Sequence, residues 1–490
     1  MRCKRGMKIL GLLLTSLVLS LFLQWSHPVS ILGSEIDEEL LTGAKVGNVF
    51  RVKNSIAQGA DINVRDGSGK TPLMHAARNN RLEVVRLLLC EGAKVNLRDQ
   101  RGRSALVWAT RANHPDIIEL LLENGADINS RDKNDATVLM HACTRGSLEA
   151  AQILIERGAD LNAGNRWSVS PAVVAAKQGH GELLKLLLNK GTGTRRNAEA
   201  LQQTLIEASR KGHTETAEAL IDSGVNIDAR DHERRTPLMV ACMLGHSETV
   251  ALLVSKGADV DAKDIRRKRP LFYAARAGDT ESMKMLLEAG ADIDGKDKYR
   301  WTPLIEACQE GHTNALKLLL AKRADPNSRT IKRLTPLMMA SREGKVQAIE
   351  LLLAKSAAID ARDLHSKTAL MHAALRNHAS AVRFLLSKGA DPNAQTSDGD
   401  TALLDACRDG HAEAVEALLV AGANPNLANR RGATPLIVAS YVGHPGITKM
   451  LLDKGADLDA RNKNGISAYD AARMSGNLKV LAILTLYQIK

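Results

Sequence analysis

Histidine is well suited to binding metals and to transferring protons near neutral pH, and the sequence contains 14 histidines. Three of them, His75, His141 and His372, occupy one position of a pattern that recurs every 33 residues. His75 and His141 are two repeats apart, too far to share a metal ion whose bonds are ~2 Å long. We therefore expect no metal site from these side chains.

The cysteines follow the same period. Cys143, Cys242, Cys308 and Cys407 fall at one repeat position, which elsewhere holds small residues such as Ala77. Stacked repeats place equivalent cysteines too far apart for a disulfide. No HExxH, GxxxxGK[ST], GxSxG or paired CxxC motif occurs in the chain. The sequence thus predicts small buried thiols, no cofactor and no enzymatic activity.

The period itself is the strongest signal in the sequence. The motif Thr-Pro-Leu-Met-x-Ala at Thr71 returns in variant forms every 33 residues as far as Ser467, without an insertion. One further step back reaches Glu38, where a degraded copy begins, so about 14 units lie between residues 38 and 490. Such units stack on their neighbours because none can bury its apolar face alone.

Each unit predicts two short helices and a turn. In the unit that starts at Thr71, this threonine is a good helix N-cap and Pro72 suits the first helical position. Asn80 stands where most units have the glycine that a left-handed turn favours. A second helix over residues 82–90 is expected to end at Gly92, and the segment that follows it carries the Asp and Gly typical of a hairpin turn.

This pattern resembles the ankyrin repeat from about residue 38 to the end. The residues that carry the resemblance are Thr-Pro-Leu, the Gly-His pair and Gly-Ala-Asp-x-Asn at Gly125 to Asn129. The resemblance implies an all-α-rich solenoid of helix-turn-helix units with β-hairpin fingers, whose first helices and fingers line a concave face. It also implies that eight histidines at one repeat position, the position of the histidine in this pair, stabilise turns. These are His114, His180, His213, His246, His312, His378, His411 and His444.

The pattern has three weak places. Residues 191–202 lack the usual finger motif, so we expect either an irregular finger or hinge, or a backward extension of the next helix over Ala198 to Gln203. The expected domains are therefore repeats over 35–190, the hinge over 191–202 and repeats over 203–490. Arg323 and Ser356 replace helix-ending glycines. The last helix is apolar nearly all round, which predicts self-association or docking of a partner there.

Residues 1–34 lie outside the repeats. Basic residues precede an apolar run over 9–23, which resembles a secretory signal or a signal anchor. The sequence leaves two interpretations open: cleavage near Ser34, or a membrane tether through residues 9–25. Both predict that the array is exported to the periplasm or the exterior, or is anchored at its amino terminus.

Four consecutive fingers are basic: residues 232–235, 265–269, 298–301 and 331–333, which we call the basic fingers. Two aromatic residues, Tyr299 and Trp301, accompany the cations in one of them, while Trp167 and Trp108 are further aromatic candidates. The interpretations are a solvated basic face, a surface that binds an acidic protein, or contact with anionic membrane or nucleic acid. The candidate binding residues are Arg234, Arg235, Arg266, Arg267, Lys268, Arg269, Lys298, Tyr299, Arg300, Trp301, Lys332 and Arg333.

The function we expect from the sequence is therefore protein binding through the concave face and the basic fingers, with no small-molecule substrate. Two alternatives remain: an accessory or protective factor that holds an enzyme, and a passive structural spacer.

Overall fold

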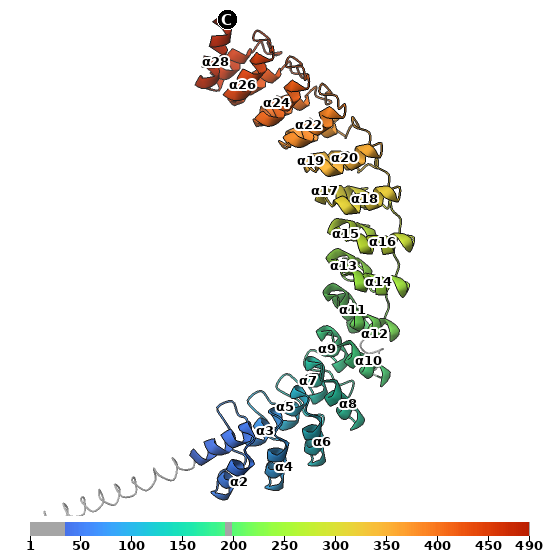
Figure 1. Cartoon of the computed structure of the whole chain (residues 1–490), viewed down its shortest axis with the longest axis vertical. Coiled ribbons are helices and arrows are strands. Elements are labelled where there is room, and N and C mark those ends of the chain that lie inside the picture. Colours follow the sequence, from blue (N-terminus) through green and yellow to red (C-terminus); the bar gives the residue numbers. More distant parts are fainter. Residues whose placement is uncertain (1–34, 192–197, 490) are drawn as a thin grey trace, which may run out of the picture. The chain divides into compact units, whose positions relative to one another are not determined.

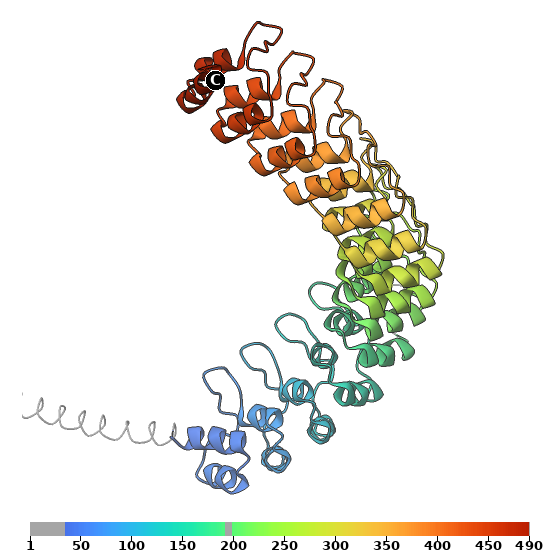
Figure 2. The same cartoon turned by 45° about the horizontal axis from the view of Figure 1, so that its top comes forward.

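The described repeats are pairs of antiparallel helices, and projecting fingers join successive pairs where the residues between them are described, as Figures 1 and 2 show. The computed structural model describes residues 35–191 and 198–489. The apolar run over 9–23 and most of the expected hinge, residues 192–197, lie outside the described residues. No helix in the described ranges is both long and apolar enough to cross a membrane.

The chain divides into two compact units. The first includes the described residues up to Ala208 and residues 213–226, and the second includes residues 209–212 and everything from Ile227. Residues 35–46 of the first unit are helical. Its named helices are α2 (Val49–Ala57), α3 (Pro72–Arg78), α4 (Leu82–Cys90), α5 (Ala105–Ala112), α6 (Pro115–Glu123), α7 (Val138–Arg145), α8 (Leu148–Glu156), α9 (Pro171–Gln178), α10 (Gly181–Asn189) and α12 (Thr214–Asp222).

In the second unit, first and second helices alternate along the chain. They are α13 (Pro237–Leu244), α14 (Ser247–Ser255), α15 (Pro270–Ala277), α16 (Thr280–Glu288), α17 (Pro303–Glu310), α18 (Thr313–Ala321), α19 (Pro336–Arg342), α20 (Val346–Ala354), α21 (Ala369–Leu375), α22 (Ala379–Ser387), α23 (Ala402–Asp409), α24 (Ala412–Val420), α25 (Pro435–Val442), α26 (Pro445–Asp453), α27 (Ala468–Met474) and α28 (Leu478–Ile489). First helices pack on first helices of the next repeat, and second helices on second helices.

The helix between these two sets, α11 (Ala198–Lys211), has 14 residues, whereas the named first helices of the other repeats have seven or eight. It begins at Ala198, so the backward extension expected from the sequence is present. Gln203 replaces the capping threonine in this repeat. A capping side chain would satisfy the first free N–H groups of a helix that began at this position. Because that cap is missing, we infer that the helix continues upstream instead of starting here.

The helix ends follow the predicted chemistry. Thr71 Oγ1 accepts a hydrogen bond from the backbone N–H of Met74 at 3.3 Å, which satisfies one otherwise free donor. Gly179 adopts a left-handed conformation with φ 82°, and a Cβ there would lie 2.6 Å from Nδ1 of His213 in the next repeat. Glycine avoids both the backbone strain and this close contact, although Asn80, Asn113 and Asn377 adopt the same left-handed conformation in other repeats.

Histidines at this repeat position bind the end of the preceding first helix, which agrees with the turn-stabilising role that the resemblance implied. Nε2 of His312 donates to the carbonyl oxygen of Arg276 at 3.0 Å, and Nε2 of His378 donates to that of Arg342 at 3.0 Å. These carbonyls belong to the last turn of the preceding first helix and have no partner within that helix. The histidines therefore close an otherwise open helix end.

A second bond between repeats explains the Asp-x-Asn motif. Asn96 Oδ1 accepts from the backbone N–H of Asp127 at 2.9 Å, and Asn327 Oδ1 accepts from that of Ala358 at 2.8 Å. Donor and acceptor are 31 residues apart in both cases. The same contact recurs along both units, so each repeat holds the start of the next finger in a fixed position.

The fingers are hairpins without strand ladders. Within the described residues, the one isolated bridge joins Arg131 to Thr137, and no longer strand forms. The expected β-hairpin geometry is nevertheless present at the tips. For example, the backbone N–H of Asp264 donates to the carbonyl oxygen of Lys268 at 3.0 Å.

The cysteines agree with the sequence prediction. Cys143, Cys242, Cys308 and Cys407 are free and buried, whereas Cys90 is free and exposed. Burial raises the pKa of each of the four buried thiols, which keeps them protonated and unreactive.

Two residues that stand in place of glycine strain the backbone, and restoring glycine should remove this strain. Arg323 and Ser356 have φ values of 68° and 61° at positions where other repeats have glycine. A side chain in this conformation costs about 1 kcal/mol. Arg323→Gly and Ser356→Gly should therefore each raise the free energy of unfolding by up to about 1 kcal/mol, measured by urea denaturation. As a control, Gly290→Ser should lower it, because Gly290 has φ 89° and its Cβ would meet no atom within 4 Å. A loss of stability in both glycine variants would contradict this assignment.

Candidate partner-binding surface

The tips of the basic fingers have a common hydrogen-bonded frame. In one, Asp264 Oδ1 accepts from the backbone N–H groups of Arg266 at 2.8 Å and Lys268 at 2.7 Å. Asp231 and Asp297 do the same in their own fingers. Because the aspartate is buried and binds the backbone, the side chains between it and the closing residue are free to point outward.

Each tip places an arginine in an unusual backbone conformation. Arg234, Arg267, Arg300 and Arg333 have φ values of 60°, 63°, 62° and 59°. We call these four the tip arginines. The equivalent residue is glycine in the fingers that contain Gly69, Gly102, Gly399, Gly432 and Gly465. Four adjacent fingers thus carry an arginine where the backbone favours glycine, at a cost of about 1 kcal/mol each.

Backbone hydrogen bonds fix these tips relative to one another. The N–H of Lys298 donates to the carbonyl oxygen of Arg266 at 2.8 Å, and the N–H of Ile331 donates to that of Tyr299 at 3.0 Å. Corresponding bonds connect Ile265 to Glu233 and Leu364 to Lys332. The tips therefore form a continuous row in a fixed register.

Apolar side chains lie among the cations on this row. The exposed fractions are 62% for Ile265, 50% for Tyr299, 56% for Ile331 and 61% for Leu364. Lys298 Nζ lies 5.4 Å from the centre of the Tyr299 ring. A row of charged and apolar groups of this kind can bind a partner by both electrostatic attraction and burial of apolar surface.

The structure divides the predicted basic residues into two groups. Seven are exposed and make no ion pair with another described residue: Arg234, Arg266, Arg267, Lys298, Arg300, Lys332 and Arg333. The other three, Arg235, Lys268 and Arg269, are partly buried and ion-paired within the array. These three hold the fingers in place and offer a partner much less charge than the sequence suggested.

Arg235 and Arg269 show what these pairs do. Arg235 Nε lies 2.8 Å from Asp231 Oδ2, and although burial opposes it, this hydrogen bond raises the pKa of Arg235. Arg269 lies between two carboxylates, 3.4 Å from Asp261 and 3.4 Å from Asp292. It also replaces the threonine cap of its repeat and makes no capping bond.

The remaining aromatic candidates differ in exposure. Trp301 is half-buried, at the finger position equivalent to Lys268, and is not on the tip. Trp167 is 64% exposed at a tip of the first unit, with the Arg166 guanidinium 5.7 Å from the centre of its ring. Trp108 is buried. Tyr299 and Trp167 are therefore the aromatic side chains most available to a partner.

The comparison with known protein families agrees with this architecture. A family model described as ankyrin repeats in three copies matches residues 40–132, 130–200, 172–264, 261–330, 324–396 and 388–462. The chain belongs to the ankyrin repeat family. Ankyrin repeats generally mediate protein–protein interaction and are typically non-enzymatic. No curated protein matches the chain.

The first-helix face of this ankyrin array carries a series of pairs that the sequence analysis missed. Nε2 of His141 donates to Asp132 Oδ2 at 3.1 Å, and the same pairing joins His75 to Asp66 at 2.9 Å. In the second unit, the Tyr273 hydroxyl donates to Asp264 at 2.6 Å. Each pair is nine residues apart, a spacing that could have revealed it. No group of three potential ligands in the described ranges is placed to hold a metal ion.

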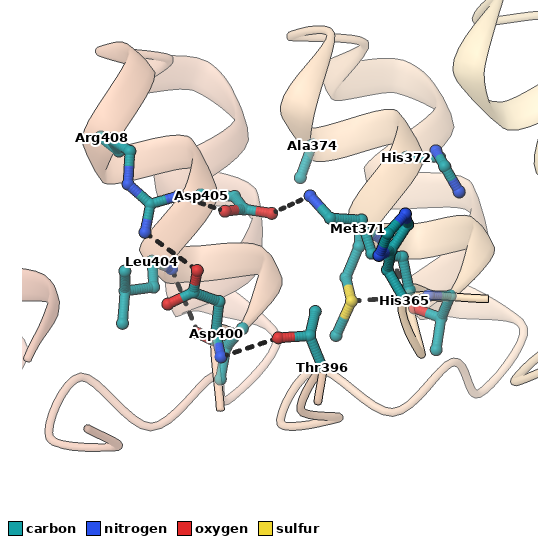
Figure 3. A network of polar contacts seen from close by, with 12 residues as sticks. His365, Met371, His372, Ala374, Thr396, Asp400, Leu404, Asp405 and Arg408 are labelled. Carbon is teal, nitrogen blue, oxygen red and sulfur yellow. Dashed lines mark hydrogen bonds and ion pairs between the residues drawn. The ribbon is translucent and has the colours of Figure 1, made fainter. Parts of the chain in front are cut away.

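Two carboxylates on this face are buried and neutralised from the preceding finger. Asp405 is 1% exposed and lies 2.8 Å from Lys367 Nζ, and Arg408 bridges it to Asp400 at 2.7 Å and 3.0 Å. Figure 3 shows the side chains of Asp400, Asp405 and Arg408 pointing toward one another. Glu306, 4% exposed, pairs with Lys268 in the same way.

The Lys268–Glu306 pair can be tested for a structural role. Lys268→Met leaves a buried carboxylate without its partner, which should lower the free energy of unfolding by about 3 kcal/mol. Adding Glu306→Leu removes the unpaired charge and should restore most of the loss in urea denaturation. Arg267→Met, at an exposed neighbour, should change stability by about 0.5 kcal/mol or less. Equal stability of Lys268→Met and the wild type would show that Lys268 is not a structural residue.

Proposed function

We propose that this ankyrin array is a protein-binding scaffold whose basic fingers and first-helix face bind an acidic protein. The observation that carries the proposal is the row of four tip arginines. Their left-handed backbone conformation lowers the stability of the fold. Their exposed side chains make no ion pair with a described residue that would offset this loss. Strain of this kind is often retained at functional sites.

The composition of the row favours a protein as the partner. Exposed Ile265, Tyr299 and Ile331 alternate with the cations, and apolar anchors beside charges are typical of protein interfaces. The fixed register of the tips means that a partner meets a preformed surface, which reduces the ordering cost of binding. A passive spacer needs neither the cations nor the strain.

Replacing the four tip arginines by glycine tests the surface without harming the fold. The variant should bind a fluorescent polyglutamate peptide at least about tenfold more weakly, because the charges nearest the probe are gone. Its stability should be equal to or higher than that of the wild type, because glycine relieves the strained backbone. Fluorescence anisotropy and urea denaturation measure the two effects.

The matched control is Ser168→Gly with Ser366→Gly, which relieves the same conformation at two tips without removing charge. It should keep the affinity of the wild type. Unchanged affinity in the arginine variant would sink the proposal, as would binding by the wild type to anionic vesicles but not to the peptide. Capture of an enzyme by the wild type, but not by the arginine variant, would favour the accessory or protective role.

We also propose that the array associates with itself through α28. Val480 and Leu484 are buried, whereas Leu478, Leu486 and Ile489 are more than 60% exposed and share one stripe of the helix. An exposed apolar stripe is typical of an interaction surface, and contact about a two-fold axis would cover it on both copies. The Tyr487 hydroxyl is hydrogen-bonded to Asp453, and the Tyr487 side chain is half-buried. Tyr487 therefore offers less surface to a second copy than the exposed residues do.

Sedimentation over a range of concentrations tests this contact. The wild type should form a dimer, and Leu486→Glu with Ile489→Glu should convert it to a monomer, because charges would be buried in the interface. Val420→Glu, at an exposed apolar residue of α24, is the control and should remain dimeric. A wild type that stays monomeric at the highest concentration would remove the proposal.

The proposed location is outside the cytoplasm or at a membrane, and it is supported by the basic and apolar segments within residues 1–34. The mature amino terminus distinguishes the two forms: a chain that begins near Ser34 is released, and one that begins at Met1 is tethered.

A further inference from the structure

A cationic pocket lies in the first unit, away from the basic fingers in the sequence. It has a volume of about 450 Å³ and lies between two adjacent fingers and the first helices α5 and α7. The side chains that matter for its charge are Arg101, Arg103, Arg111, Asp132, Lys133 and His141. We call it the Arg111 pocket.

The acids near this pocket are already used by the fold. Asp132 Oδ1 accepts from the backbone N–H groups of Asn134 at 2.7 Å and Ala136 at 3.0 Å, and its Oδ2 accepts from His141. Asp99 pairs with Arg103 at 3.1 Å. Neither carboxylate makes an ion pair with Arg101, Arg111 or Lys133, although Asp132 keeps its negative charge beside them.

These three cations make no ion pair with any described residue. Arg111 is half-buried, and its Nη1 donates to Nδ1 of His141 at 3.1 Å. Because arginine only donates, Nδ1 accepts and Nε2 carries the proton that is donated to Asp132. The chain Asp132–His141–Arg111 thus holds the guanidinium in a fixed position at the pocket.

The surroundings of Arg111 are positively charged. Burial and the nearby charges of Arg145 and Arg103 lower the pKa of Arg111, and the opposing effect of Asp132 is smaller. On the same face, the ring of Trp108 brings further cations together. Its ring is contacted by Arg103 at 4.1 Å, and by Arg78 at 5.0 Å and Lys70 at 5.1 Å. The buried Trp108 thereby holds guanidinium groups close together.

We propose that the Arg111 pocket binds a phosphoryl group. Three cations beside one carboxylate, Asp132, leave an excess of about two positive charges, which matches a group that carries nearly two negative charges and three acceptor oxygens. A single carboxylate would leave part of this excess unneutralised. The amides of Gln100 and Asn134, which also line the pocket, supply further donors. Arginine is well suited to this role because its fork of N–H groups matches phosphate geometry.

This site is separate from the basic fingers, which carry the proposed function. Its residues belong to the first unit, and the tip arginines belong to the second. One site can therefore fail its test while the other passes.

Calorimetric titration of the full chain tests the pocket. Phenyl phosphate should bind, and glutamate at the same concentration should bind at least about tenfold more weakly. Arg111→Met should weaken phenyl phosphate binding by about tenfold or more, because one charged hydrogen-bonding group is lost. Arg86→Met, which removes the same charge from an exposed site on α4, should leave binding unchanged.

A second variant keeps the test valid if Arg111→Met does not fold. Lys133 is exposed, so Lys133→Met should keep the melting temperature of the wild type and still weaken binding. Two further titrations identify the source of the phosphoryl group: a phosphoserine peptide and phosphatidate vesicles. Binding to either that is lost in Arg111→Met and Lys133→Met supports the site.

Three results would overturn the proposal. The wild type could bind none of the phosphoryl probes, it could bind glutamate as tightly as phenyl phosphate, or both variants could bind phenyl phosphate like the wild type.

Discussion

The hydrogen bond from one repeat to the finger of the next is the contact on which the array depends. Asn96 accepts from Asp127, and the same bond recurs between later repeats at a separation of 31 residues. The side chain of the accepting asparagine is short, so it reaches the next finger in one register only. An inserted residue would therefore break this hydrogen bond. This explains why the motif returns every 33 residues without an insertion. This bond sets where the next finger begins, whereas the aspartate bonds within a finger set the geometry of its tip.

The sequence predicted local structure well because local structure depends on neighbouring residues. The Thr71 cap, the left-handed Gly179 and Arg323, and the buried cysteines at equivalent positions all agree with expectation. Each depends on backbone geometry or size within one repeat, which the residue type reveals directly. The backward extension of α11 was one of two alternatives that the sequence left open there, and it is the one that is present.

The candidate site was harder to predict because its side chains pair across repeats. Lys268 and Glu306 are 38 residues apart, and only the direction of each side chain in the stack brings them together. A count of basic residues therefore overstated the free charge of the basic fingers. The Arg111 pocket was missed for a related reason. Its excess charge is visible only when Asp99 is seen to pair with Arg103 and three cations are seen to share one carboxylate, Asp132.

The frame of the tips has a consequence for how such a protein can change over generations. The polar residue that binds the backbone at the start of a finger, such as Asp264 or Thr330, carries the fold, whereas the tip residues after it touch no core. Mutations there alter what the surface recognises at little cost to folding. The described fingers share this division between residues that hold the finger and residues at its tip. A duplicated unit therefore adds a new position that selection can vary on its own. The array can thus acquire a new specificity one finger at a time, with the core unchanged.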